Sequence, residues 1–232
     1  MATLLSLAQD VARESGTVPT IGQPETVTNQ TGRLLRIVLW VRDAHMRLQR
    51  HHKWRWLHAD FEGSTIAGVR SYDAAAMGIT SRFSRWVYRD EEGCDLFTIH
   101  GTDQADEGYL SFVEWRDFRR HMMIGSAATE TGRPNCISIN DSDEIVLYPT
   151  PDDTYTIRGV YMKSPQDLTD DGDVPEMPEE YHEAIRWGAL VLLGEFDEAR
   201  EQVPGWAAKY YEIVDKMRDA QLPRITIAGP ME

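Results

Sequence analysis

The sequence predicts an α+β protein: helices from the two ends of the chain form a bundle, and an antiparallel β domain is inserted between them. Apolar residues recur with helical spacing before residue 57 and again after residue 178, whereas short β-prone runs separated by turn residues fill the stretch between. The connections between these runs are too short for crossover helices, which favours antiparallel pairing. The predicted domains are a helical bundle (1–57 and 178–221), a β-rich domain with one short helix and an acidic linker (58–177), and an extended C-terminal arm (222–232).

Two helices are predicted in the N-terminal part of the chain. The first covers residues 3–15 and ends at Gly16, a residue that commonly stops helices. Its apolar face consists of Leu4, Leu7, Ala8, Val11 and Ala12. The stretch 29–57 predicts a long amphipathic helix that leads into an aromatic cluster. Its helical part of about 20 residues is expected to extend about 30 Å.

The aromatic cluster is the Trp54-Arg55-Trp56-Leu57 run, where helical periodicity gives way to strand periodicity. Large aromatic side chains at such a point usually fill a core. We therefore expect Trp54, Trp56 and Leu57 to form the structural junction between the bundle and the β domain, rather than a ligand site.

The middle of the chain predicts strands and one short helix. The helix is expected at 114–123, and the strands at 84–89 and 95–99 are expected to form a hairpin around the turn 90–93. The last three strands are expected to form an antiparallel meander. The predicted strands cover residues 58–62, 64–68, 84–89, 95–99, 109–113, 136–139, 144–148 and 155–161.

The C-terminal part predicts a helix from Pro178, a break at 203–205, and a further helix from Trp206 to Gln221. The arm that follows alternates like a strand at 224–228 but has no strand beside it in the sequence. A frayed tail and strand addition to a partner subunit are equally compatible with this pattern. In the second interpretation the residues that bind the portal or another partner are Leu222, Arg224, Ile225 and Ile227.

The composition excludes two broad classes of protein. The net charge of −14 argues against a general nucleic-acid binder, which would present a basic face. No apolar run approaches the 18 residues that a membrane helix needs, so no membrane partner is expected. The two cysteines, Cys94 and Cys136, do not form a C-x-x-C pair and are expected to be buried or half-buried free thiols.

No motif predicts a cofactor or metal site. The phosphate-binding patterns G-x-x-x-x-G-K-[ST] and G-x-G-x-x-G are absent, as is the nucleophile motif G-x-S-x-G. His51 and His52 are adjacent, so on a helix they diverge by about 100° and do not share a metal ion easily. The acidic run that starts at Asp167 places Pro178 where a calcium loop needs a glutamate.

Paired carboxylates are the one catalytic pattern that the residues leave open. A glycosidase-like pair could be drawn from several acids of the β domain, although nothing singles out two of them. These acids are Glu62, Asp90, Glu91, Glu92, Asp106 and Glu107.

A series of short motifs carries a resemblance to a known family. They are Leu4-x-x-Leu7-Ala8-x-x-Val11-Ala12-Arg13-Glu14-Ser15-Gly16, Thr31-Gly32-Arg33-Leu34 with Trp40-Val41, Trp54-Arg55-Trp56-Leu57, Phe112-Val113-Glu114-Trp115-Arg116-Asp117-Phe118-Arg119, Gly132-Arg133-Pro134, Tyr148-Pro149-Thr150-Pro151-Asp152 and Pro178-Glu179-Glu180-Tyr181-His182. In this order they resemble the phage head-to-tail adaptor proteins, which include the tail tubular A-type adaptors. The resemblance covers roughly residues 3–222.

The resemblance implies a structural virion protein and not an enzyme. Proteins of that family form a twelvefold ring at the head–tail junction. The expected partners are the portal protein, tail or nozzle proteins, and neighbouring copies of the chain; DNA passes through the lumen without specific binding. The family's arms often reach into the portal, which suits residues 222–232. The alternatives are another tail-completion protein, such as a stopper or terminator, and a virion-associated hydrolase that uses paired carboxylates.

Overall fold

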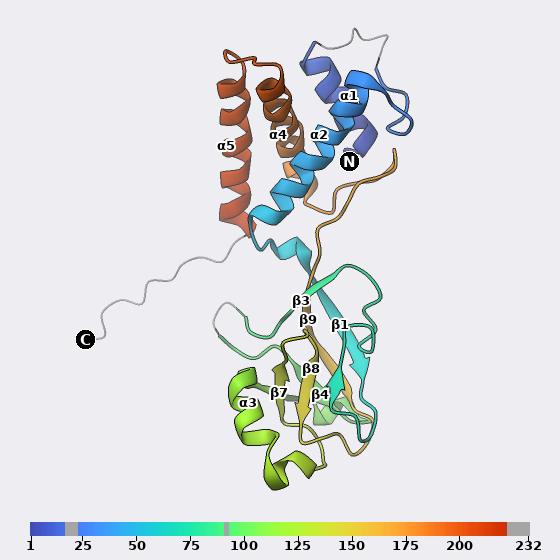
Figure 1. Cartoon of the computed structure of the whole chain (residues 1–232), viewed down its shortest axis with the longest axis vertical. Helices are drawn as coiled ribbons and strands as arrows, with labels where there is room; N and C mark the ends of the chain where they lie inside the picture. Colours follow the sequence, from blue (N-terminus) through green and yellow to red (C-terminus); the bar gives the residue numbers. More distant parts are fainter. Residues whose placement is uncertain (17–22, 91–92, 222–232) are drawn as a thin grey trace, which may run out of the picture. The chain divides into compact units, whose positions relative to one another are not determined.

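Figure 1 shows the computed structural model of the chain, in which residues 1–16, 23–90 and 93–221 are described. These residues form helices and antiparallel or mixed sheets, so the α+β fold class is confirmed. The chain divides into two compact units. The helical unit contains Met1–Trp56 and the chain from Pro165 onward, and the β unit contains Leu57–Ser164.

Helix α1 (Leu4–Glu14) begins at a capping box and buries one apolar face. The Thr3 side chain accepts a hydrogen bond from the Ser6 backbone amide at 3.2 Å, and the Ser6 hydroxyl accepts one from the Thr3 amide at 2.8 Å. These bonds satisfy two amides that have no partner within the helix. The buried face is the predicted one and contains Leu4, Leu7, Ala8, Val11 and Ala12.

Helix α4 (His182–Phe196) is the centre of the helical unit, because it contacts α1, α2 (Gly32–His51) and α5 (Val203–Gln221). Figure 1 shows the four helices packed side by side. Two glycines allow the close approach. A Cβ at Gly188 would lie 3.2 Å from Ala44 of α2, and a Cβ at Gly194 would lie 2.5 Å from Val203 of α5.

The expected break at Val203-Pro204-Gly205 is wrong. These residues are the first turn of α5. Proline is compatible with the first helical turn because its missing amide has no intrahelical partner there in any case. The preceding helix starts slightly later than expected: a 3₁₀ turn (Glu179–Tyr181) comes before α4.

The acidic segment 165–177 belongs to the helical unit and is held there by hydrogen bonds. Buried Gln49 of α2 accepts from the Gln166 amide at 2.8 Å and donates to its carbonyl at 2.9 Å. The Asp173 carbonyl accepts from the Leu4 amide at 2.9 Å. The segment therefore joins α1 to α2.

The β unit contains short strands and one helix, α3 (Trp115–Met122). The strand expected at 64–68 is not formed, because the chain turns there and the Val69 amide donates to the Ile66 carbonyl. The strands are β1 (His58–Ser64), β2 (Ser71–Tyr72), β3 (Phe83–Val87), β4 (Thr98–His100), β5 (Gly108–Tyr109), β6 (Ser111–Phe112), β7 (Cys136–Ile139), β8 (Ile145–Tyr148) and β9 (Thr156–Lys163).

Strand β9 organises the five-stranded sheet found among the described residues. It pairs with β1 along one edge, and with β4 and β3 in succession along the other. The expected hairpin of 84–89 with 95–99 forms only at its turn end, where the Leu96 amide donates to the Tyr88 carbonyl at 3.0 Å. Both segments pair with β9, and a single bridge, Arg89 to Asp95, connects them directly.

The prediction that the last three strands form an antiparallel meander is wrong for the third strand, β9. Strands β7 and β8 pair in a four-stranded sheet with β2 and β6, whereas β9 belongs to the other sheet. The β6–β7 pair is parallel, with α3 in the connection between the two strands. The expectation of purely antiparallel pairing is thus also wrong.

A glycine in β9 allows two aromatic rings to pack closely against the strand. Gly159 has no side chain, so Phe61 of β1 and Phe97 can pack over it; a Cβ there would lie within 2.9 Å of both rings. The Trp86 indole donates to the Asp143 carbonyl at 2.8 Å, which links β3 to the β7–β8 turn. The core that results contains Phe61, Tyr72, Met77, Ile79, Trp86, Phe97, Ile99, Leu110, Phe112, Ile137, Ile145, Leu147 and Ile157.

Candidate functional site

The aromatic cluster at the end of α2 is a stack of rings. Trp54 is completely buried, and its indole nitrogen donates to the Leu48 carbonyl at 2.7 Å. The Trp56 ring stacks on it with the centroids 4.7 Å apart, and His52 meets its edge at 4.9 Å. The Trp54 ring therefore lies between two others, and its polar atom is satisfied.

The residues predicted for the structural junction differ in burial. Trp54 and Leu57 are buried, whereas Trp56 is half-buried. The Trp56 indole nitrogen and His52 Nε2 are both inaccessible to solvent and have no hydrogen-bond partner among the described residues. Burial lowers the pKa of His52, and the nearby charges of His51 and Arg218 lower it further.

A second feature of the helical unit is a set of exposed apolar side chains, which we call the helical patch: Leu35 and Leu39 of α2 with Phe196 at the end of α4. These side chains are 40%, 44% and 54% exposed. Trp40 packs on the Phe196 ring at 5.6 Å, and the Arg36 guanidinium lies over it at 4.5 Å.

An ion pair fixes the end of α4 beside α2 at this patch. Arg33 donates two hydrogen bonds to Asp197, one of them at 2.9 Å. The hydrogen bond from Arg33 lowers the pKa of the Asp197 carboxyl, and the same bond raises the pKa of the Arg33 guanidinium. The two helix ends are thus held together by charge as well as by aromatic packing.

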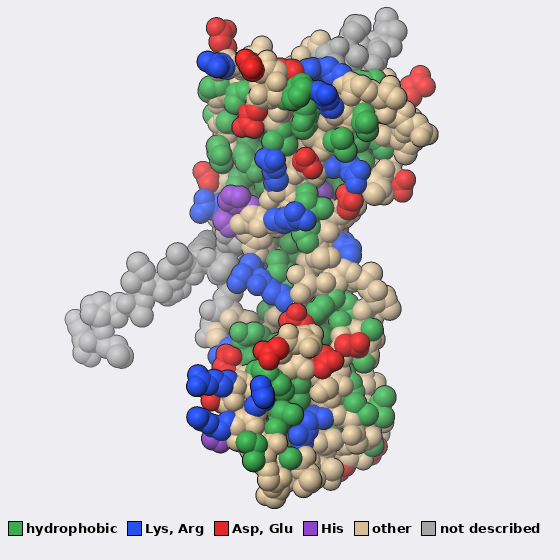
Figure 2. Space-filling model, in the orientation of Figure 1, with side chains coloured by type: hydrophobic (Ala, Val, Ile, Leu, Met, Phe, Trp, Pro, Cys, Tyr) green, Lys and Arg blue, Asp and Glu red, His purple; other side chains and the backbone are tan. Residues whose placement is uncertain are grey.

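In the β unit three arginines of α3, Arg116, Arg119 and Arg120, are exposed, and we call them the arginine face. Figure 2 shows Lys and Arg side chains gathered over the region where Figure 1 places α3. The helix is anchored by Phe118, which is completely buried, and the exposed side chains of Met123 and Ile124 follow its end.

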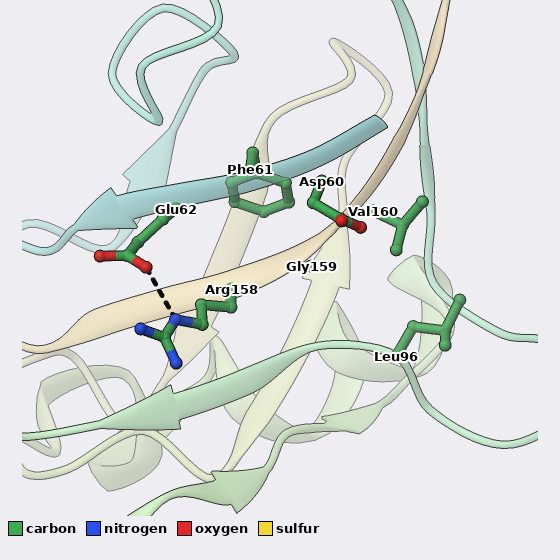
Figure 3. Close-up of a pocket in the computed structure, with 7 residues that line it drawn as sticks. All are labelled: Asp60, Phe61, Glu62, Leu96, Arg158, Gly159 and Val160. Carbon is green, nitrogen blue, oxygen red and sulfur yellow. Dashed lines mark hydrogen bonds and ion pairs between the residues drawn. The ribbon is translucent and has the colours of Figure 1, made fainter. Parts of the chain in front are cut away.

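An open groove of about 470 Å³ runs beside β1 and β9. Figure 3 shows that Glu62 of β1 reaches Arg158 of β9, and the carboxylate accepts a hydrogen bond from the guanidinium at 2.7 Å. The Asp60 carboxylate also lines the groove but lies apart from this pair (Figure 3).

Most of the described acids considered for a catalytic pair contact an arginine or a hydrogen-bond donor. Asp106 pairs with Arg133 at 2.9 Å. The hydrogen bond from Thr98 lowers the pKa of Glu107, and the Arg158 charge contributes to the same shift. A general acid requires the opposite shift, so this arrangement does not favour hydrolysis. Asp90 accepts from the Cys94 amide, and Glu91 and Glu92 lie outside the described residues.

The described part of the chain contains no cluster of three or more His, Cys, Asp or Glu side chains that could hold a metal ion. No helix within it is long and apolar enough to cross a membrane. Cys94 and Cys136 are both free thiols. Cys136 is half-buried as expected, whereas Cys94 is exposed, so the expected burial is wrong for Cys94.

The predicted partner-binding residues Leu222, Arg224, Ile225 and Ile227 all lie outside the described residues. Sequence reasoning missed the helical patch and the arginine face. The signal for the first was the apolar pair Leu35 and Leu39, which falls off the buried stripe of α2. For the second it was three arginines within five residues of an otherwise acidic chain.

Comparison with known families decides what kind of protein carries these surfaces. The family model described as SU10 adaptor protein matches residues 2–230. The chain belongs to the SU10 adaptor family. This is a family of phage head–tail adaptors, so the resemblance noted from the sequence motifs is confirmed. No curated protein matches the chain.

Membership in the SU10 adaptor family is consistent with candidate sites that are exposed surface patches. A structural adaptor acts by binding other proteins, and the features described above are exposed apolar and charged patches. The family places the protein at the head–tail junction of the virion.

Proposed function

We propose that twelve copies of this protein form a ring between the portal and the tail, through which the genome passes. The observation that carries the proposal is the match to the SU10 adaptor family over nearly the whole chain. A ring requires each copy to present two different complementary surfaces. The proposal assigns these to the helical bundle and the β domain of each copy.

The charge of the chain supports a passage that does not retain DNA. A net charge of −14 gives a ring of twelve copies a strongly negative surface. Carboxylates that face the lumen repel phosphates, and screening confines this repulsion to about 8 Å at physiological salt. DNA is then kept off the wall while it moves.

The portal contact is assigned to the C-terminal arm. Residues 222–232 alternate apolar and polar side chains at Arg224-Ile225-Thr226-Ile227, a pattern that suits strand addition to a partner. In this proposal Leu222, Ile225 and Ile227 supply the apolar contacts, and Arg224 pairs with a partner carboxylate. Tail or nozzle proteins bind the opposite side of the ring.

Co-assembly with the portal tests the function. The full chain, co-expressed with the portal protein of the same phage, is expected to appear as a ring on the portal in electron micrographs. Twelvefold averaging of that ring checks the number of copies. A chain that stays monomeric beside assembled portals would contradict the proposal. A ring found only on isolated tails would instead indicate a tail-completion protein.

Truncation after Gln221 tests the arm separately. The shortened chain is expected to fold with an unchanged melting temperature, because α5 is complete at Gln221. Its binding to portal, measured by co-sedimentation, is expected to fall. Undiminished binding would remove the arm from the portal contact.

A further inference from the structure

Within the described chain, the three arginines of the α3 face form no ion pair. Among the residues that the structure describes, Arg116 and Arg120 have no ion pair or polar contact, and Arg119 contacts only the Trp115 ring, at 5.9 Å. Arginines elsewhere are commonly paired, as Arg33, Arg42, Arg133 and Arg158 are. The spacing i, i+3, i+4 places the three on one side of the helix.

The same surface continues into apolar side chains. Met123 and Ile124 directly follow α3 and are 39% and 67% exposed. A phosphate backbone needs no apolar contact, whereas arginine and methionine are both enriched at protein–protein interfaces. The combination therefore favours a protein partner that offers an apolar surface with unpaired acids.

The helical patch has that chemistry. Exposed Leu35, Leu39 and Phe196 provide the apolar surface. Glu195 and Glu198 flank Phe196 and Glu201 follows them; all three are exposed and have no ion-pair partner in the described ranges.

The charges at the two surfaces have opposite signs. At the helical patch, Arg33 neutralises Asp197, so Arg36 and Arg200 stand against the three glutamates. At α3 the three arginines lie together on one side of the helix, and the carboxylates nearby are Glu114, Asp117 and Asp141, the last within 3.3 Å of the Trp115 indole nitrogen. Unpaired glutamates therefore outnumber unpaired arginines at the patch, whereas the arginine face itself carries three positive charges, and opposite charges of this kind select a partner and its orientation.

We propose that the arginine face of α3 and the neighbouring Met123 and Ile124 bind the helical patch of a second copy of this chain. The contact joins two different surfaces, so it propagates from copy to copy, as a ring requires. The inference rests on the proposed ring and identifies which surfaces close it.

Charge reversal tests the contact in the full-length protein. One variant carries Arg119→Glu and Arg120→Glu, and another carries Glu195→Arg and Glu198→Arg. Each is expected to lower self-association on the portal by about tenfold or more, measured by sedimentation and particle counting, because like charges then meet across the contact. Circular dichroism checks that both variants fold.

Rescue separates a direct contact from a general effect of charge. A 1:1 mixture of the two variants, or one chain that carries all four changes, again brings opposite charges together and is expected to assemble like the parent. The matched control is Arg47→Glu with Arg50→Glu on α2, which reverses two other exposed arginines and is expected to leave assembly unchanged.

The outcomes distinguish this inference from the proposed function. Parent-like rings from the α3 variant would overturn the inference and leave the adaptor function intact. The inference would also be overturned if the α3 variant assembled normally and lost only its retention on a DNA column, because the arginine face would then bind DNA. If the parent forms no ring, a thiol crosslink decides: Arg120→Cys and Glu198→Cys chains, mixed in a Cys94→Ser background, are expected to join through a short bismaleimide. Failure to crosslink would overturn the contact.

Discussion

At the scale of single residues, the aromatic cluster concentrates stability in one side chain. Trp54 has no exposed surface, stacks on Trp56 and satisfies its indole nitrogen on the Leu48 carbonyl. Trp56 is half-buried, and its indole nitrogen has no hydrogen-bond partner among the described residues. The sequence predicted the cluster but did not rank its two tryptophans.

Trp54→Ala is expected to lower the free energy of unfolding by about 3–5 kcal/mol, because it leaves a cavity and an unpaired Leu48 carbonyl. Trp56→Ala is expected to cost less. Urea unfolding followed by circular dichroism measures both. Equal losses for the two variants would mean that Trp56 is as deeply embedded as Trp54.

His52 makes stability depend on pH. Its pKa in the folded chain is lower than the ordinary 6.5, because burial and the charges of His51 and Arg218 disfavour the imidazolium. Below pH 6.5 the unfolded chain therefore binds the proton more readily than the folded chain, and stability falls as the pH drops from 6.5 toward the folded pKa.

The expected result is a lower urea midpoint at pH 5.5 than at pH 7.5. His52→Phe keeps a ring against Trp54 but cannot be protonated, so it is expected to reduce this difference. The comparison of parent and variant isolates His52 from the other histidines. An identical pH dependence in the two proteins would show that His52 does not contribute.

At the scale of elements, the contact between α4 and α5 depends on the absence of a side chain. A Cβ at Gly194 would lie 2.5 Å from Val203 and 2.9 Å from Trp206. Gly194→Ala is therefore expected to destabilise by about 1–3 kcal/mol, although alanine is normally the better helix former. The measurement is the melting temperature and urea midpoint of the full chain.

Gly205 provides the matched control on the same pair of helices. It lies in the first turn of α5, and nothing is within 4 Å of the position a Cβ would occupy. Gly205→Ala is expected to be neutral or to stabilise by up to about 1 kcal/mol. If both alanines behaved alike, close packing at Gly194 would not be the cause.

Elements with a local signal were predictable, and those defined by distant partners were not. Helix α1 and strand β7 match their predicted ranges closely, because a cap, an apolar stripe or an alternating run lies within each. The partners of β3 and β4 were mispredicted, because their pairing with β9 depends on the packing of Phe61 and Phe97 over Gly159, and β9 lies far along the chain from both.

The surfaces were harder to predict than the elements for a related reason. Periodicity marks the side chains that a fold buries and says nothing about the role of an exposed side chain. Leu35 and Leu39 fall off the buried stripe of α2, but only their exposed fractions in the folded chain mark them as part of a surface. The unpaired arginines of α3 become visible only when the ion pairs of the described chain are known.

At the scale of the whole molecule, the β unit is expected to fold without the helices. Its core residues lie within Leu57–Ser164. The two ends of that segment are neighbours, because His58 at the start of β1 is the pairing partner of Met162 near the end of β9. A segment whose two ends lie on adjacent strands can be cut out of the chain without disrupting its own core.

A fragment of residues 57–164 is therefore expected to give a cooperative thermal transition and a dispersed amide NMR spectrum. Trp86→Ala within the fragment should abolish that transition, because the ring is buried against Phe61 and Phe97 and its indole holds the Asp143 carbonyl. If the wild-type fragment is unfolded while the full chain is stable, the β unit needs the helices to fold. Each copy would then act in the ring as a single folded body, without an independently folded docking surface in its β domain.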